Sequence, residues 1–215
     1  MKTVLSKLRK FLAFDILLVC LLFTTSIFAA QPSEELAGLL NKFNAMTGQF
    51  TQVLYDANGK PMQKSSGSMA LQRPGKFRWE VYQPNPQLLI ADGNSLWIYD
   101  KDLAQATKQK LDQSSNSPAL LLSGSIESVQ ARFNVSYPGN ENAAGKWFML
   151  KPKDKNDMFQ WVELRFVNGS LADMRLYDNL NTLTDFHFSK VKINPPLNAS
   201  MFQFKAPKGV EVIKN

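Results

Sequence analysis

From Gln49 onward, apolar and polar residues alternate in short runs that are separated by turn-forming residues. Alternation with a period of two is typical of a β-strand with one face toward water. The runs predict about eleven strands, over residues 49–55, 62–72, 76–82, 87–91, 95–100, 105–111, 132–137, 146–151, 158–167, 170–177 and 182–193. Because short connections containing Pro-Gly, Asp-Gly or Asn-Gly join antiparallel neighbours, the expected topology is a long meander.

Two segments predict helices instead. Ser33 is a candidate N-cap for a helix over 33–47. Its apolar stripe consists of Leu36, Leu39, Leu40 and Phe43. Proline at a first helical position predicts a second, short and very apolar helix over 118–123, stopped at Gly124, and residues 125–130 are compatible with a further turn.

The C-terminal part contains one more segment with alternating residues. Phe202 and Phe204 alternate with polar residues after the Pro195-Pro196 break. Residues 201–210 are therefore expected to form either a closing strand or an arm that covers a sheet edge.

The hairpin around Pro74-Gly75 carries the main functional signal. On its outgoing arm Phe77, Trp79 and Val81 alternate with charged residues, which predicts one apolar and one charged face. On its incoming arm Met69 and Leu71 have the same parity as Arg73. Parity therefore places Arg73 at the rim of the apolar face.

So many antiparallel strands predict a mainly β fold, either as two packed sheets or as one strongly curved sheet, with the two helices as a lid or plug. A barrel of more than about eight strands encloses more space than its own side chains fill. Outside residues 1–30 the chain keeps eleven of its 15 Phe, all four Trp and seven of its eight Met, which supply wide apolar walls. An apolar cavity for acyl chains is one interpretation, and a sandwich core filled by these side chains is the other.

Arg73 needs hydrogen-bond acceptors, because burying an unpaired guanidinium is prohibitive. The last carbonyls of a helix lack partners and lie at its negative end, so those near Leu122 and Ser123 are candidates. The hypothesis is a latch in which Arg73 holds a helical lid closed. The alternative is an ordinary strand arginine paired with a carboxylate across the sheet.

Residues 1–30 predict a secretory signal peptide, with basic residues before an apolar run that ends at Ala29-Ala30. Asp15 makes the run too short for a membrane anchor. Cys20, the single cysteine, lies in this run, preceded by valine where a lipidation signal has a small residue, so a lipidated N-terminus is disfavoured. Without residues 1–30, four basic residues and one acidic residue are lost and the net charge falls from +7 to +4. A cysteine-free exported chain favours the periplasm, and residues 31–215 are expected to form one domain.

The sequence offers little chemistry for catalysis. His187 is the single histidine and lies within an expected strand, so a structural role is favoured over a catalytic or metal-binding one. No serine stands in a nucleophile motif and no glycine-rich phosphate loop occurs. Charges are interleaved along the strands, which favours a solvated surface over a nucleic-acid or anionic-membrane surface. We expect no enzyme activity, no cofactor and no metal.

Several motifs together resemble a known family, the periplasmic outer-membrane lipoprotein carriers (LolA). The motifs are GQFTQ at 48–52, RPGKFRW at 73–79, DGNSLWIY at 92–99, SPALLL at 117–122, and MFQF at 201–204 with PKGV at 207–210. The resemblance covers nearly the whole chain after residue 30, in order.

The resemblance implies a fold, an incomplete, half-open antiparallel β-barrel of about eleven strands with an α-helical lid. It also implies a carrier that takes lipoprotein acyl chains from an inner-membrane ABC extruder and delivers them to an outer-membrane receptor lipoprotein. The implied latch consists of Arg73, Leu40, Leu122 and Ser123. The implied acyl cavity includes Phe50, Phe77, Trp79, Leu40, Leu120 and Leu122. A monomer without stable membrane insertion is expected. Two alternatives stay open: a receptor of the same fold (LolB-like), and a non-catalytic periplasmic regulatory or interaction domain.

Overall fold

A computed structural model describes residues 31–111, 118–139 and 144–214. The predicted signal peptide, residues 1–30, lies outside the described residues. The helices are α2 (Pro32–Leu40), α3 (Pro118–Ser123) and α4 (Ile126–Arg132), with a 3₁₀ turn, η1 (Ala199–Phe202). The strands are β1 (Ala45–Tyr55), β2 (Pro61–Gln72), β3 (Lys76–Gln83), β4 (Gln87–Asp92), β5 (Ser95–Asp100), β6 (Gln105–Lys110), β7 (Phe133–Ser136), β8 (Lys146–Pro152), β9 (Phe159–Val167), β10 (Ser170–Asp178), β11 (Leu183–Ile193) and β12 (Glu211–Lys214).

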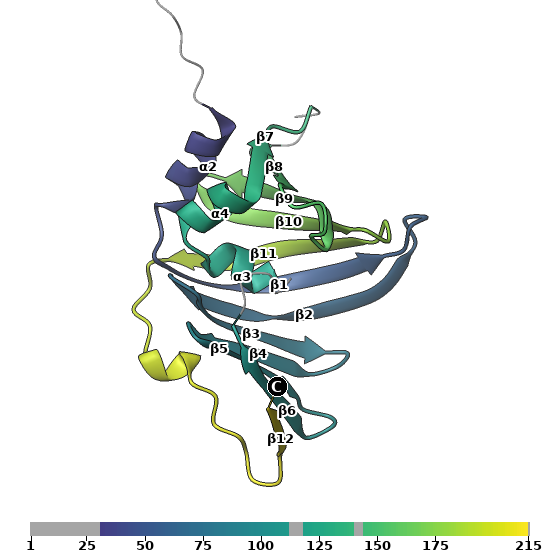
Figure 1. Ribbon diagram of the computed structural model, residues 1–215, viewed down its shortest axis with the longest axis vertical. Helices are drawn as coiled ribbons and strands as arrows, with labels where there is room; N and C mark the ends of the chain where they lie inside the picture. Colours follow the sequence, from purple (N-terminus) through teal and green to yellow (C-terminus); the bar gives the residue numbers. More distant parts are fainter. Residues whose placement is uncertain (1–30, 112–117, 140–143, 215) are drawn as a thin grey trace, which may run out of the picture. The chain divides into compact units, whose positions relative to one another are not determined.

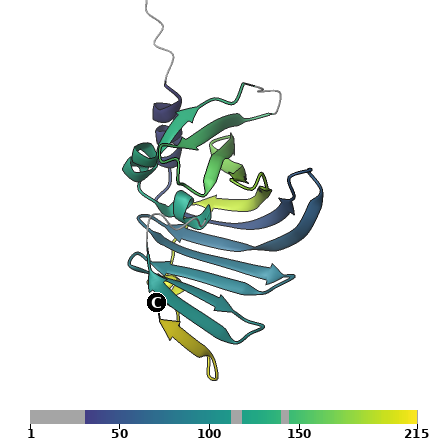
Figure 2. The ribbon, with the colours of Figure 1, turned by 45° about the vertical axis from the view of Figure 1, so that its right-hand side comes forward.

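The strands form one open, strongly curved sheet, which confirms the predicted fold class (Figures 1 and 2). Its order is β12-β6-β5-β4-β3-β2-β1-β11-β10-β9-β8-β7. The predicted strand ranges match the observed ones closely, because turn residues bound each run. The single long meander is wrong, however: β1–β6 and β7–β11 form separate meanders, joined where β1 pairs with β11, with Phe50 opposite Phe188.

Helix α2 is shorter than predicted. It ends at Leu40, and strand β1 already begins at Ala45, so the predicted helix over 33–47 is wrong in its second half. Residues from Ala45 onward are extended because they hydrogen-bond to β2 on one side and β11 on the other. Ser33 is not the cap either, since Gln31 takes that position with Pro32 directly after it. Phe43 is buried, as its place in the apolar stripe indicates, but it lies in the turn before β1.

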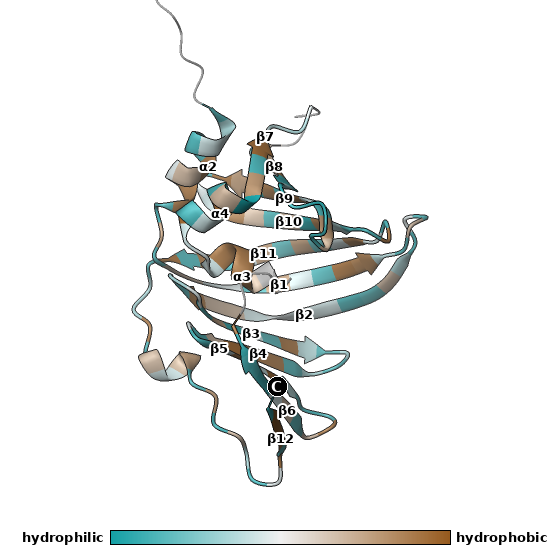
Figure 3. Cartoon of the chain, in the orientation of Figure 1, coloured by the Kyte–Doolittle hydropathy of each residue, from teal (hydrophilic) through white to brown (hydrophobic). Residues whose placement is uncertain are grey.

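The helices gather at one end of the sheet. Because neighbouring strands are antiparallel, the turns alternate between two ends, as Figure 1 shows. The lid end contains the turns at 73–75, 93–94 and 168–169, with α2, α3 and α4 nearby. The mouth end contains the turns at 56–60, 84–86, 101–104, 153–158 and 179–182. Helix α3, coloured as hydrophobic in Figure 3, packs on β2 and β3.

The C-terminal segment covers the edge of the sheet, one of the two predicted alternatives. After η1, which packs against β3 and β4, the chain continues to β12, which pairs in parallel with β6. On the way Phe204 packs against Trp97, with ring centroids 4.8 Å apart. The strand forms at 211–214, beyond the predicted segment, because the partner edge is β6 rather than a barrel seam.

Candidate functional site

Arg73 joins two helices to the rim of the sheet. It follows the last residue of β2, and its side chain lies beneath the helices. Its Nη1 donates to the carbonyl of Leu40, the last residue of α2, at 2.7 Å. Its Nε and Nη2 both donate to the Leu122 carbonyl, at 3.2 and 3.0 Å, in the last turn of α3. The guanidinium also stacks over the Phe43 ring, 4.4 Å from its centroid. The parity argument for its direction is confirmed.

The acceptors explain how this cation is accommodated. Burial lowers the pKa of Arg73 to about 10, which still leaves the guanidinium protonated at neutral pH. Both acceptors are carbonyls at helix C-termini, where backbone oxygens lack partners and carry partial negative charge. The guanidinium N–H groups thereby gain acceptors and the two helix-end carbonyls gain donors, and no carboxylate takes part.

Ser123 belongs to the same junction through another donor. Its carbonyl accepts the Gly75 N–H at 2.8 Å, so the hairpin backbone and Arg73 hold two successive residues of α3. The Ser123 hydroxyl is buried and has no hydrogen-bond partner among the described residues. An unsatisfied buried hydroxyl costs about 1–3 kcal/mol. It therefore lowers the stability of this junction between α3 and the hairpin.

A second contact holds the start of α2. Lys146 Nζ and the Tyr137 hydroxyl both donate to the Glu35 carboxylate in the first helical turn. These hydrogen bonds, that of Lys146 first, lower the pKa of Glu35 below its ordinary value. Helix α2 is thus fastened to the β7–β8 side at its first turn and to Arg73 at its end.

The inner face of the sheet is lined by aromatic rings. Phe50 stacks on Trp79 with centroids 4.3 Å apart, and Phe186 meets the edge of both rings. Phe188 joins at 6.3 Å from Trp79. Gly67 makes this packing possible, because a Cβ there would lie 2.6 Å from the Phe50 ring. The four rings fill the middle of the concave face.

Open space lies on either side of these rings. Toward the mouth end a cavity of about 470 Å³ is bordered by apolar walls and by amides. Its apolar lining is Trp79, Val81, Leu89, Phe159, Leu176 and Phe186, and Gln52, Gln63, Asn85 and Gln87 stand among its polar residues. We call it the mouth cavity.

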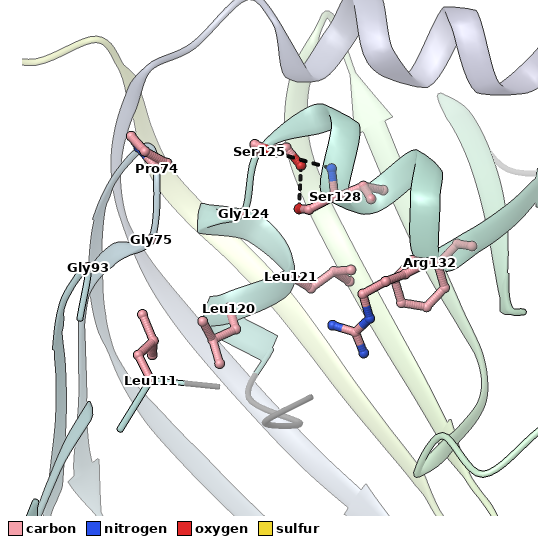
Figure 4. A pocket seen from close by; sticks show the side chains of 12 residues that line it. Pro74, Gly75, Gly93, Leu111, Leu120, Leu121, Gly124, Ser125, Ser128 and Arg132 are labelled. Atoms are coloured by element: carbon pink, nitrogen blue, oxygen red, sulfur yellow. Dashed lines mark hydrogen bonds between the residues drawn. The ribbon is translucent and has the colours of Figure 1, made fainter. Parts of the chain in front are cut away.

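A second space of about 300 Å³ lies beside the lid helices (Figure 4). Leu111, Leu120 and Leu121 point into it, and the Pro74-Gly75 turn forms one border. Opposite, Ser125 caps α4 by accepting the Ser128 N–H at 3.1 Å. This space, which we call the lid groove, lies between residues of α3 and residues of α4.

The structure brings the predicted cavity residues together. Leu40, Phe50, Phe77, Trp79, Leu120 and Leu122 are all buried in one hydrophobic cluster. Trp79 also borders the mouth cavity and Leu120 the lid groove. The sequence analysis missed Phe186 and Phe188, although their alternation in the run 182–193 gives the same signal as Phe77 and Trp79. His187 points to the outer face, where its Nδ1 lies 2.9 Å from Asp173.

The fold and this site define a class of protein: an open half-barrel with an apolar inner face and helices fastened across one end. Among the described residues, no helix has the length and apolar character needed to cross a membrane.

Comparison with known proteins agrees with this class. The family model "Outer membrane lipoprotein carrier protein LolA" matches residues 41–205. The outer-membrane lipoprotein carrier protein of Pseudomonas paraeruginosa is 42% identical over 182 residues, covering 84% of this chain and 86% of the relative. The corresponding protein of Legionella pneumophila is 41% identical over 201 residues, covering 92% and 97%.

A solved structure shares the fold at low sequence identity. An uncharacterised conserved protein from Thermus thermophilus superposes with a TM-score of 0.55 at 12% identity, over 86% of this chain and all of the other. With the family match and the relatives above, the chain belongs to the outer-membrane lipoprotein carrier (LolA) family.

Proposed function

We propose that this protein carries lipoproteins through the periplasm, with their acyl chains held against the concave apolar face. It takes them from an inner-membrane ABC extruder and delivers them to an outer-membrane receptor lipoprotein. Residues 1–30 direct export and are removed, and residues 31–215 act as one monomeric carrier domain. The chain binds and releases its cargo without catalysing a reaction.

One observation carries this proposal: Arg73 hydrogen-bonds to the ends of both α2 and α3 across the same face that the aromatic rings line. In the proposed cycle these bonds hold the lid closed when the carrier is empty. Phe50, Phe77 and Trp79 then part from Leu40, Leu120 and Leu122 as acyl chains enter. Ser123, fastened through its carbonyl, moves with α3.

The free energy of the three Arg73 hydrogen bonds is comparable to the free energy of burying part of one acyl chain. Hydrogen bonds to a charged group are each worth about 1.5–3 kcal/mol, so three of them contribute about 5 kcal/mol or more. Each buried methylene contributes about 0.8 kcal/mol, and about six methylenes offset the lost bonds. A fatty-acyl chain has more methylenes than that, so cargo binding is sufficient to open the lid.

The carrier proposal is tested on spheroplasts. We expect the purified protein to release lipoproteins from the spheroplast membrane into the soluble fraction, in a complex detected by native mass spectrometry. A protein that releases no lipoprotein and has an unmodified N-terminus contradicts the proposal and leaves the regulatory domain as the better description. A diacylglyceryl-cysteine N-terminus identifies a receptor instead.

Arg73→Leu tests the latch. The variant is expected to fold and to bind cargo, because leucine fits an apolar junction, but to deliver cargo to the acceptor at least about tenfold more slowly. Without the bonds to Leu40 and Leu122, closure no longer favours cargo release. The measurement is the time course of lipoprotein transfer from the purified complex to the receptor. Arg78→Leu, which removes a strand arginine paired with Glu80 at 3.0 Å, is the matched control. Equal transfer by both variants rules out the latch.

A further inference from the structure

Every hairpin at the mouth end exposes one large apolar side chain. They are Leu103 between β5 and β6, Leu180 between β10 and β11, Met158 between β8 and β9, Met62 in the first residues of β2, and Tyr82 in the last residues of β3. The exposed fractions run from 50% for Tyr82 to 77% for Leu180. At the lid end, among the described residues, the exposed large apolar side chain is Tyr137 in the β7–β8 connection, which is 38% exposed and hydrogen-bonds to Glu35. The asymmetry between the two ends needs an explanation.

Local turn chemistry does not require these residues. Turns favour Gly, Asn, Asp and Ser, as the lid-end turns Asp92-Gly93 and Asn168-Gly169 illustrate. A leucine at a turn tip contributes nothing to the turn and leaves apolar surface in water. Because these side chains gather at the end where the mouth cavity lies, they suit contact with an apolar partner.

Leu103 and Leu180 lie in turns whose backbone is fixed by hydrogen bonds to aspartate side chains. Asp100 Oδ1 accepts the Leu103 N–H at 3.0 Å, and Asp178 Oδ1 accepts the Leu180 N–H at 2.9 Å. Asp178 also accepts the Thr182 N–H at 2.8 Å. With their backbones fixed in this way, neither leucine can turn inward to cover its side chain.

The spacing of the exposed side chains at the hairpin tips distinguishes a lipid surface from a protein partner. Adjacent hairpins lie two strands apart, which is about 10 Å at about 4.8 Å per strand. The tips therefore do not merge into one continuous patch. A specific protein interface buries about 1,200–2,000 Å² of complementary surface, whereas a lipid interface accepts isolated apolar side chains one at a time.

Charges of both signs stand at the same end. Lys60 and Lys155 are exposed, and so are Asp102 and Asp154. Contact with a lipid surface at this end therefore depends on the apolar side chains and not on an excess of basic charge.

We propose that the mouth end seats reversibly on the lipid surface of a membrane, with Leu103, Leu180, Met62 and Met158 entering the headgroup region. The mouth cavity borders Asn85 and Asp100 at the same strand ends, so it then opens directly onto the bilayer. Resting on the proposed carrier function, this contact gives an acyl chain a route between bilayer and inner face that avoids water.

An environment-sensitive label tests this contact. In a Cys20→Ala background each variant has a single cysteine, and NBD is attached at Leu103→Cys, at Leu180→Cys or, as the lid-end control, at Lys42→Cys. With vesicles of phosphatidylethanolamine and phosphatidylglycerol, 3:1, we expect NBD fluorescence to rise at 103 and 180 and to stay unchanged at 42. No rise at the tips, or an equal rise at all three positions, overturns the proposal. A rise that requires native inner-membrane vesicles and does not occur with pure lipid indicates a protein partner and overturns it as well.

A pair of reciprocal variants makes the test quantitative. Leu103→Ser/Leu180→Ser is expected to lower partitioning onto these vesicles at least about tenfold, given the transfer free energy of a leucine side chain. Lys42→Leu, which adds a leucine at the lid end, is expected to leave partitioning unchanged. The opposite pattern contradicts the proposal, and circular dichroism verifies folding of each variant.

Failure of this inference is distinguishable from failure of the carrier proposal. Binding of dansyl-undecanoate without vesicles reports on the concave face alone. We expect wild type and Leu103→Ser/Leu180→Ser to bind the probe equally, while its transfer from vesicles is slower in the variant. If wild type binds no probe, the acyl cavity is refuted, and the label experiment still decides the membrane contact.

Discussion

Gly67 sets the depth to which Phe50 packs against Trp79. A Cβ at this position would meet the Phe50 ring at 2.6 Å and the Glu80 carbonyl at 2.0 Å. Since the carbonyl belongs to the neighbouring strand, the strand itself would have to shift. The absence of one methyl group thus shapes the inner face.

Gly67→Ala is therefore expected to destabilise the protein by about 2–3 kcal/mol, as overpacking of a well-packed core does. Urea unfolding followed by tryptophan fluorescence measures the change. Gly38→Ala is the matched control, because nothing lies within 4 Å of the added Cβ in α2. Alanine there should stabilise the helix by about 0.5–1 kcal/mol. Similar effects of both substitutions would contradict the steric account.

At this scale the sequence indicates the direction of Arg73 and one of its two acceptors. Alternation with Met69 and Leu71 aimed it at the apolar face, and the expected helix end pointed to the Leu122 carbonyl. Nothing local indicates that the Leu40 carbonyl, 33 residues away, also accepts a hydrogen bond. The Leu40 assignment came from the family resemblance, and the Gly75–Ser123 bond was not anticipated.

Helix α2 depends on contacts at both of its ends more than on its own propensity. It has nine residues and no side-chain cap, and a helix of that length is marginal by itself in water. The periodicity that predicted it continued through Phe43, yet the strand ladder of β1 ended it earlier. Tertiary pairing overrode the local pattern there.

The attachment of α2 through Glu35 should depend on pH. Because the pKa of Glu35 is lowered in the folded state, its stabilising contribution is present above the ordinary value of 4.5 and is lost as pH falls through the lower folded value. The pair with Lys146 is partly exposed, so we expect less than about 1 kcal/mol.

The measurement is amide hydrogen exchange of α2 between pH 6 and pH 3.5, corrected for intrinsic rates. Glu35→Gln should expose α2 at both pH values and remove most of the difference. Glu34→Gln, at the exposed neighbouring position, should behave as wild type. A pH dependence that persists in Glu35→Gln would assign the effect to another group.

For the whole sheet, the pairing of strands that are distant in sequence is the feature that local patterns describe least. The junction of β1 with β11 lies in the middle of the open sheet and pairs Met46 with Ile193, 147 positions away. Turn residues specify sequential neighbours only, so the two-meander order was not predictable from them. Strand existence and boundaries were predictable, because each depends on a few adjacent residues.

Removing residues 211–215 should expose the edge of β6. Glu211 N–H donates to the Ala104 carbonyl at 3.0 Å, and β12 pairs along β6 as far as Lys108. An unpaired edge strand is a template for pairing with another chain. We expect concentration-dependent oligomers in light scattering after size exclusion, and none when only Asn215 is removed. A truncated protein that stays monomeric at high concentration would show that β6 is protected by other means.

The bonds of Arg73 to carbonyl oxygens also bear on how this molecule varies under mutation. Every amino acid carries the same carbonyl, so substitutions at Leu40 or Leu122 change packing without deleting the acceptor that Arg73 uses. The side chains at these two helix ends are therefore constrained by packing and not by the hydrogen bonds to Arg73. Loss of the guanidinium removes all three hydrogen bonds at once, and no substitution at Leu40 or Leu122 replaces the missing donors.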